Sequence, residues 1–203
     1  MSTLAKVLRP RFARGSAGTV VPARLGSQLY DVALVLAGSA LIALSAQVAV
    51  PLPFSPVPVT GQSFAVLLLG ATLGRTRGVA AVLAYLAEGA VGLPVFAGGV
   101  AGPAVLLGPT GGYLLGFLPA AWICGALAER GWDRHFLGTL AAMAAGDLAI
   151  FAVGVPWLAR FVGPENAIAF GVTPFVAGNA AKIVLAAGML PAAWALVRRS
   201  RGR

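Results

Sequence analysis

Six strongly polar side chains lie within long apolar stretches of the sequence or at their ends, where contact with lipid would be unfavourable. They are Gln47, Gln62, Glu88, Asp147, Asn179 and Lys182. Ionisable groups inside a membrane segment usually face the interior of a helix bundle and mark a binding or transport site. We therefore expect these side chains to line a polar cavity. In the alternative, Asp147 and Lys182 form a structural ion pair and the amides only cap helix ends.

The chemistry of Lys182 suits an anionic partner, because an ammonium group held away from water is stabilised by a carboxylate. That carboxylate belongs either to Asp147 or to a ligand. Asn179 lies three residues before Lys182, so on a helix both side chains reach the same space. An amide donates and accepts hydrogen bonds, which suits a neutral head group such as a urea. The pair therefore favours a small, partly apolar anion with a neutral hydrogen-bonding head.

The composition places these residues in a membrane protein. Hydrophobic residues make up 59% of the 203 residues and charged residues only 10%, and the mean hydropathy is +0.88. A soluble domain carries about a quarter charged residues, so this chain has too few to cover a surface that faces water. This excludes a soluble enzyme and a disordered tail. A single cysteine, Cys124, excludes an internal disulfide.

Apolar runs predict the helices that position the site. A helix needs about 20 mostly apolar residues to cross a bilayer. Six runs are candidates, of which the second is too short to cross unaided: Val32–Val50, Ser63–Leu73, Val79–Leu93, Gly111–Ala128, Phe136–Gly154 and Pro174–Val197. Four prolines forbid a regular helix across Pro51–Gly61. We predict an all-α membrane protein, a six-transmembrane-helix bundle at 31–197, with a basic segment at 1–30 and a basic tail at 198–203.

The basic residues predict how this bundle is oriented. They gather in both terminal segments and in the connections that contain Arg75 and Arg77 or Arg130 and Arg134, whereas the alternate connections carry almost no charge. Basic connections stay on the cytoplasmic side of a membrane, so we expect both termini in the cytoplasm. The six polar side chains then lie in the outer half of the bundle, and the cavity opens outward.

The outer segment Gly92–Tyr113 is rich in glycine and proline but carries no charge. Irregular backbone at membrane depth is tolerated only where protein or a water-filled cavity surrounds it. We expect a re-entrant or ordered outer loop that packs over the cavity, with Phe96 and Tyr113 as apolar walls. Its glycines allow the backbone to approach a ligand closely. A loop that packs without any ligand is the alternative.

Motifs for other functions are missing. The sequence has no Walker A, HExxH or GxSxG pattern, and His135 has no partner at metal-ligand spacing. The net charge of +9 lies largely in flanking segments without interleaved aromatic residues, so we expect no nucleic acid as partner. We also expect no catalytic residue, no metal and no cofactor. Ala33 and Ala37 have the spacing of small residues that allows close helix contact, within the bundle or with a partner.

Four motifs resemble those of one family of vitamin transport proteins. They are PVPVTGQ at Pro56–Gln62, GLPVFAGG at Gly92–Gly99, LLGPTGGYLLGF at Leu106–Phe117 and PFVAGNAAK at Pro174–Lys182. The sequence thereby resembles the BioY family over the range from Asp31 to Val197. BioY proteins are the biotin-binding S components of energy-coupling-factor (ECF) vitamin transporters.

This resemblance implies a multi-pass protein of the bacterial cytoplasmic membrane that captures biotin from outside. It implies a transmembrane coupling protein and two ATPase subunits as partners, with the coupling protein docked on Ala33 and Ala37. The family usually has an aspartate three residues before the lysine of the fourth motif, where this chain has Asn179. The charge beside Lys182 is therefore different here, which leaves affinity or specificity at this position open.

The shared depth and the resemblance together give a predicted biotin site. We expect Lys182 and Asn179 to contact the ligand, Tyr113 and the adjoining turn to shape the pocket, and Gln62 and Glu88 to line its mouth. The full set is Gln62, Glu88, Phe96, Gly108, Thr110, Gly111, Gly112, Tyr113, Asp147, Asn179 and Lys182. One alternative is a self-sufficient secondary carrier for a small carboxylate, with an ion relay through Glu88, Asp147 and Lys182. Another is a structural subunit without a ligand.

Overall fold

The computed structural model describes residues 3–7 and 23–201. The helices are α1 (Leu4–Val7), α3 (Ala23–Gln47), α4 (Gln62–Leu73), α5 (Arg75–Ala90), α6 (Pro103–Leu107), α7 (Gly111–Glu129), α8 (Phe136–Val162), α9 (Pro164–Gly171) and α10 (Val176–Arg201). The remaining elements are the strands β1 (Ala49–Leu52) and β2 (Ser55–Thr60) and the 3-10 turns η1 (Ala97–Gly99), η2 (Trp132–Arg134) and η3 (Thr173–Phe175). Most of the expected basic segment at 1–30, and the end of the tail at 202–203, lie outside the described residues.

Within the described part of the chain, four segments are long and apolar enough to cross a membrane. They are Leu25–Gln47, Gly111–Glu129, Phe136–Val162 and Pro164–Ser200. The six predicted runs all recur as helices, but α4 has only 12 residues and α5 has 16. A 12-residue helix is about 18 Å long, which is shorter than the hydrocarbon core of a bilayer. The protein is thus mostly helical with four candidate spans.

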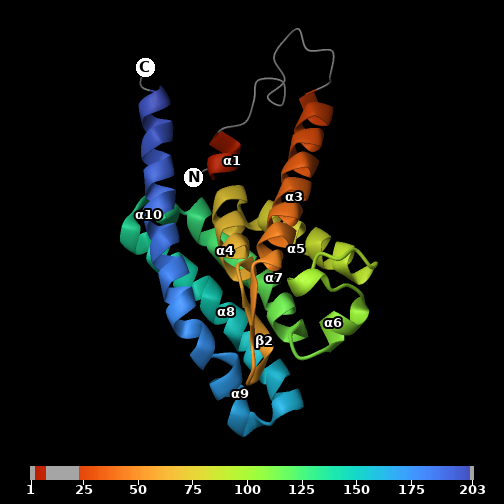
Figure 1. Cartoon of the computed structure of the whole chain (residues 1–203). Coiled ribbons are helices and arrows are strands. Elements are labelled where there is room, and N and C mark those ends of the chain that lie inside the picture. Colours follow the sequence, from red (N-terminus) through yellow and green to blue (C-terminus); the bar gives the residue numbers. More distant parts are fainter. Residues whose placement is uncertain (1–2, 8–22, 202–203) are drawn as a thin grey trace.

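The proline-rich segment between α3 and α4 forms an antiparallel β-hairpin, which the all-α prediction did not include. Its register pairs Ala49 with Thr60, with an irregularity near the tip. Both strands of a two-stranded hairpin are edge strands, where the missing N–H of a proline is tolerated. The hydroxyl of Ser55 donates a hydrogen bond to the carbonyl of Phe170 over 2.8 Å, so the tip contacts α9 (Figure 1).

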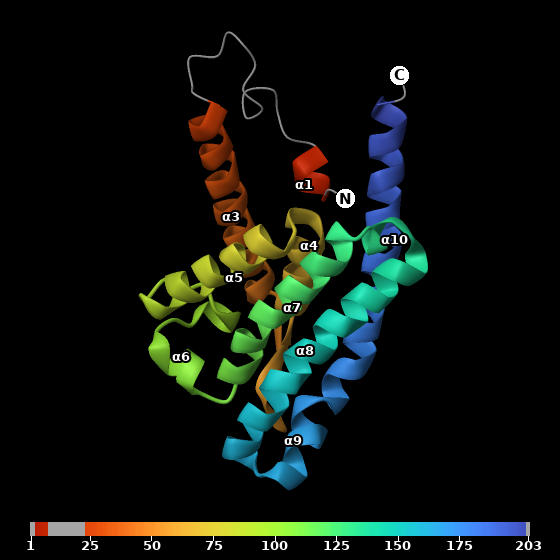
Figure 2. The ribbon, with the colours of Figure 1, turned by 180° about the vertical axis from the view of Figure 1, so that it is seen from behind.

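α7 is the central helix and packs against α4, α5 and α8 (Figure 2). Glycines allow these helices to approach closely, as small residues do in membrane bundles. A Cβ atom added to Gly70 of α4 would lie 2.6 Å from the carbonyl oxygen of Ala121 in α7. One added to Gly116 of α7 would lie 3.0 Å from the backbone of Ile150 in α8. The core therefore depends on direct contact between backbones.

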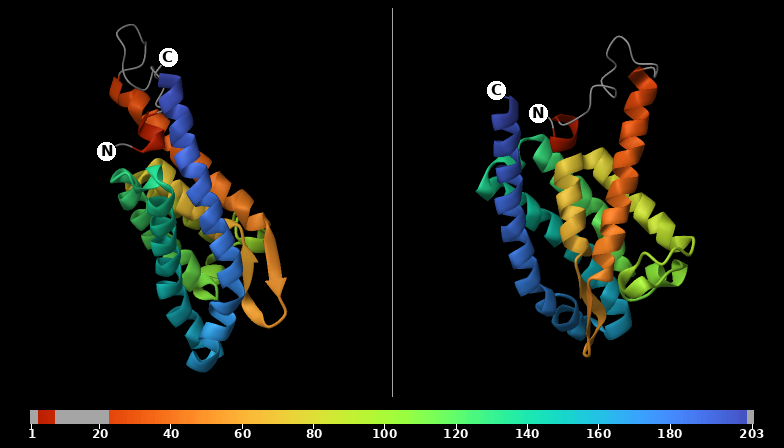
Figure 3. Two further views of the ribbon diagram at one scale, coloured as in Figure 1. Left: turned by 90° about the vertical axis from the view of Figure 1, so that its left-hand side faces the viewer. Right: turned by 45° about the horizontal axis from the view of Figure 1, so that its top comes forward.

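The two ends of the bundle differ in what they carry. α1, the first turn of α3 and the last turn of α10 lie at one end, and the hairpin tip lies with α9 at the other. α10 extends along α8 and passes the hairpin, so it connects both ends (Figure 3). Two ion pairs attach α5 to its neighbours, Arg77 with Asp31 of α3 at 2.7 Å and Arg75 with Glu129 of α7 at 3.4 Å.

Candidate functional site

A cavity of about 240 Å³ lies between the hairpin, α4, α7, α8 and α10, and the segment 96–105 forms one of its walls. Its polar lining comes from Thr60, Gln62, Ser63, Thr110, Asn179 and Lys182. Its apolar lining includes Phe96, Tyr113, Phe117, Ile150, Phe151 and Phe175. Small-molecule sites usually have this form, with mostly apolar walls and a few convergent polar groups.

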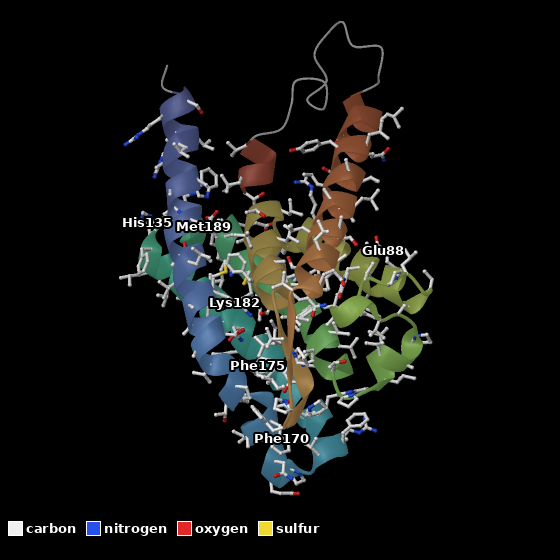
Figure 4. All side chains as sticks on the ribbon, in the orientation of Figure 1. Glu88, His135, Phe170, Phe175, Lys182 and Met189 are labelled. Carbon is white, nitrogen blue, oxygen red and sulfur yellow. The ribbon has the colours of Figure 1, made fainter. Side chains whose placement is uncertain are left out.

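Lys182 brings a positive charge to this cavity. Its Nζ donates hydrogen bonds to the carbonyl of Thr60 at 2.8 Å, to Oγ of Ser63 at 3.0 Å and to Oδ1 of Asn179 at 3.2 Å. An ammonium group has three donors, and these three acceptors are all neutral. Figure 4 shows Lys182 near the middle of the bundle, close to Phe175. A carboxylate that enters the cavity would therefore find a cation that no directly bonded anion has neutralised.

Asn179 lies between Lys182 and Asp147. Its Nδ2 donates to Oδ1 of Asp147 at 2.7 Å, while its Oδ1 accepts from Lys182. Both Asn179 and Asp147 are buried. The alternative expectation was a direct ion pair between Asp147 and Lys182. In the structure the amide of Asn179 instead bridges the carboxylate and the ammonium group. Asn179 lines the cavity, and Asp147 lies behind it.

Three aromatic rings form one apolar wall. The ring of Tyr113 stacks on Phe175 at 6.3 Å and meets Phe151 edge-on at 6.4 Å, and Phe151 contacts Phe175 at 6.4 Å. The hydroxyl of Tyr113 donates to the carbonyl of Gly171 at 2.9 Å, which anchors this ring to the end of α9. Such rigid rings offer a large apolar surface at little cost in conformational entropy.

The glycine-rich segment before α7 forms another part of the wall. Phe96 is buried against Tyr85, with the ring centres 5.5 Å apart in an edge-on arrangement. Gly89 carries no side chain at the place that this ring fills. Gln62 donates a hydrogen bond to the hydroxyl of the same Tyr85. Gln47, at the end of α3, donates to the carbonyl of Phe96 at 3.4 Å and so attaches the segment to α3.

The turn before α7 is shaped by Trp157 of α8. The indole N–H of Trp157 donates to the carbonyl of Gly108 at 2.9 Å, and a Cβ atom at Gly112 would overlap the Trp157 side chain. A Cβ atom at Gly111 would overlap the backbone of Leu106. These glycines are therefore required by close packing. Of the predicted turn, only Thr110 itself lines the cavity.

The sequence and the fold both have known counterparts. The model of the BioY family matches residues 15–199. The chain belongs to the BioY family. It is 41% identical over 156 residues to the probable biotin transporter BioY of Pyrococcus horikoshii. This match covers 77% of this chain and 91% of that protein. It is 44% identical over 150 residues to the biotin transporter BioY of Thermotoga maritima, covering 73% and 86%.

A solved structure supports the same assignment. The crystal structure of the S-component for biotin from an ECF-type ABC transporter superposes with a TM-score of 0.72 at 26% identity, covering 92% of this chain and 96% of that one. The family resemblance expected from the four motifs is thereby confirmed. The chain is a BioY family member with four segments that are long and apolar enough to cross a membrane, and it is a membrane transport protein and not an enzyme.

Five predicted members of the BioY site lie outside the cavity lining, namely the turn glycines Gly108, Gly111 and Gly112 and the carboxylates Glu88 and Asp147. The carboxylate of Glu88 on α5 accepts a hydrogen bond from Oγ of Ser39 on α3 at 2.5 Å. Figure 4 shows Glu88 on the side of the bundle away from Lys182. Asp147 contacts the cavity only through Asn179. The carrier alternative requires an ion relay through Glu88, Asp147 and Lys182. Glu88 lies apart from the other two residues, so the structure does not form this relay as one cluster.

Several cavity residues were not predicted from the sequence. Thr60 and Ser63 flank Gln62 in and next to the first BioY motif, and Phe175 lies four residues before Asn179 in the last one. The spacing of four residues, which places side chains on one helix face, was the available signal for Phe175. The contribution of Phe151 depends on how α8 packs against α7, which the sequence pattern does not give.

Proposed function

We propose that this chain is the high-affinity biotin-binding S component of an ECF-type uptake transporter. The observation that carries the proposal is the cavity with Lys182 and Asn179 at one place and aromatic walls around it. Biotin has a carboxylate, an apolar middle and a neutral ureido group, which such a lining can accept. The names of the two relatives and of the solved structure support the same ligand.

The geometry favours one orientation of the ligand. Nζ of Lys182 lies 3.2 Å from Oδ1 of Asn179, so both side chains contact the same end of a bound molecule. A carboxylate gains more from an ammonium group than a neutral ureido group does, because the hydrogen bond is charge-assisted. In the proposed complex the carboxylate therefore lies at Lys182. The ureido group lies toward the remaining polar lining at Gln62 and Thr110.

The proposed membrane arrangement follows from the charges at the ends of the bundle. The end with α1 and the last turn of α10 faces the cytoplasm of a bacterium, and the hairpin tip and α9 face outward. All six apolar helices belong to the membrane domain, with α4 and α5 as short members. Ala33 and Ala37 are exposed on α3. This face of α3 is the proposed contact with a transmembrane coupling protein that works with two ATPase subunits.

Purified protein tests the proposed ligand directly. We expect one biotin per chain to be released on denaturation after expression in biotin-containing medium, as measured by mass spectrometry. Lipoate has a carboxylate and an apolar chain but no ureido group, so it is the matched control and should not displace biotin at equal concentration. Absence of released biotin, together with no binding to the apo protein, would contradict the proposal. Uptake in cells that lack coupling and ATPase subunits would favour the self-sufficient carrier.

Exchanging the carboxylate and the amide tests the bridge between α8 and α10. We expect Asn179→Asp to weaken biotin binding about tenfold, because two carboxylates then compete for one proton or repel each other at 2.7 Å. The double variant Asp147→Asn, Asn179→Asp restores one carboxylate and one amide, and should return to within about threefold of the original affinity. Isothermal titration measures all three proteins. Equal affinities for the single and the double variant would show that the bridge does not matter.

A further inference from the structure

A second cavity, which is open to the surface, lies at the end of the bundle that carries the last turns of α10. It has a volume of about 620 Å³ and lies where α7 ends, α8 begins and α10 passes. Its lining consists of Arg130, Gly131, Trp132, Arg134, His135, Leu137, Gly138, Ala141 and Arg198. It contains three arginines and the sole histidine of the chain, and none of the described acidic residues lines it. Figure 4 shows His135 at this end, beside α10.

The basic side chains come from segments far apart in the sequence. Arg130 directly follows the last residue of α7, and the left-handed glycine Gly131 then reverses the chain into η2. Arg134 and His135 follow directly before α8. Arg198 comes from α10, more than sixty residues later. The fold therefore brings together basic side chains that are far apart in the sequence.

A buried contact between α10 and η2 holds these basic side chains close together. The indole N–H of Trp194 on α10 donates to Oδ2 of Asp133 at 2.5 Å, and the guanidinium of Arg134 lies 4.5 Å from the centre of the Trp194 ring. Burial raises the pKa of Asp133 above its ordinary value, although the hydrogen bond from Trp194 and the charge of Arg134 act in the opposite direction. The carboxyl group of Asp133 is directed toward Trp194 and is absent from the cavity lining. The two other arginines, Arg130 and Arg198, are exposed.

Apolar side chains border the same cavity on the surface. Trp132 and Leu137 line the cavity and are 43% and 76% exposed. Phe136 lies between the lining residues His135 and Leu137 in the chain and is 48% exposed. Tryptophan is enriched where a membrane meets water. Arginine recognises phosphate oxygens by paired hydrogen bonds, and the free N–H groups at the start of the 27-residue helix α8 add to the attraction for an anion. The site thus combines phosphate chemistry with an apolar border.

We propose that this cavity binds the phosphodiester head group of an anionic phospholipid. The arginines contact the phosphate, and the acyl chains lie against the apolar border formed by Trp132, Phe136 and Leu137. Basic pockets between membrane helices bind lipid head groups in this way. Arginine recognises the anionic phosphate oxygens, which a free phosphate also has. The proposal does not depend on the identity of the transported ligand.

Binding of phosphatidylglycerol to the purified full chain tests this site. The probe is native mass spectrometry after exchange into mixed micelles that contain phosphatidylglycerol and phosphatidylcholine in equal amounts. We expect the wild type to retain phosphatidylglycerol selectively. Each arginine near the surface contributes about 1 kcal/mol, so Arg130→Gln and Arg198→Gln should each reduce retention about fivefold, and the double variant about twenty-five-fold. Arg134 is left unchanged because it also contacts Trp194.

The matched control is Arg160→Gln. Arg160 also lies over a tryptophan ring, that of Trp157 at 5.2 Å, but it belongs to the other end of α8. It should leave retention unchanged, and biotin binding should be unchanged in all these variants. Equal retention of the two lipids, or an equal loss in Arg160→Gln, would overturn the proposal. Displacement of the lipid by glycerol phosphate or inorganic phosphate at millimolar concentration would assign the site to a free phosphate and would also overturn it.

Discussion

Lys182→Met lowers the affinity for biotin by about a hundredfold or more in the proposed complex. Removal of one partner from a charge pair that is shielded from water costs about 2–5 kcal/mol, and about 2.7 kcal/mol corresponds to a hundredfold change. Methionine keeps the length of the apolar chain and removes the ammonium group. The loss should therefore report the charge and its hydrogen bonds and should not come from an empty space at the site.

Biotinamide, in which the carboxylate is replaced by a neutral amide, identifies the group that Lys182 contacts. If Lys182 contacts the carboxylate, wild-type protein discriminates strongly against biotinamide, and the Lys182→Met variant binds both ligands with similar weak affinity. An equal loss for both ligands would place the ureido end at Lys182 instead. Val184→Met is the control for folding, since Val184 lies on the same helix and is 53% exposed. Unchanged biotin affinity in Lys182→Met would remove this residue from the site.

Gly70→Val destabilises the packing of α4, α5 and α7. A side chain at Gly70 would meet the carbonyl oxygen of Ala121 at 2.6 Å, and Gly78 of α5 approaches the Cα of Gly70 from the other side. Neither neighbour is a flexible side chain, so whole helices must move apart. Overpacking of a core costs about 1–3 kcal/mol, and contact with backbone places this change at or above the upper limit. We expect the midpoint of thermal unfolding to fall by about 10 °C or more.

The chain supplies its own probe for this measurement. Cys124 is the single cysteine and is fully buried, so a thiol-reactive fluorescent dye reports opening of the core on heating. Gly188→Val is the matched control, because nothing lies within 4 Å of a Cβ atom at Gly188 on α10. It should unfold close to the wild-type temperature. Comparable labelling curves for both variants would contradict the role given to Gly70.

The apolar runs and the motifs predicted much of the fold because both depend on local sequence. Length and hydropathy are enough to place α3, α7, α8 and α10, and prolines are enough to exclude a helix between α3 and α4. The pairing of Ala49 with Thr60 could not be predicted in the same way. Prolines exclude one structure without specifying another, so the hairpin could not be derived from them. The extension of α8 through Pro156 to Val162 was missed for a related reason, since proline disfavours a helix interior but surrounding helices compensate for it.

Depth alone could not separate the polar residues of the site. Lys182, Asn179 and Gln62 line the cavity, whereas Glu88 faces α3 and is bound by Ser39. All four were placed at similar depth, and the direction of each side chain around its helix depends on packing between helices. The same limit applies to Asp147. Its contact with Asn179 joins residues 32 positions apart, which no local pattern specifies.

The hydrogen bond from Lys182 to the carbonyl of Thr60 has a consequence for the empty and the loaded protein. Thr60 is the last residue of β2, so the ammonium group on α10 tethers the base of the hairpin. The three donors of Lys182 are already used, and an incoming carboxylate must take one of them from Thr60, Ser63 or Asn179. Occupation of the cavity and restraint of the hairpin thus compete for the same three hydrogens.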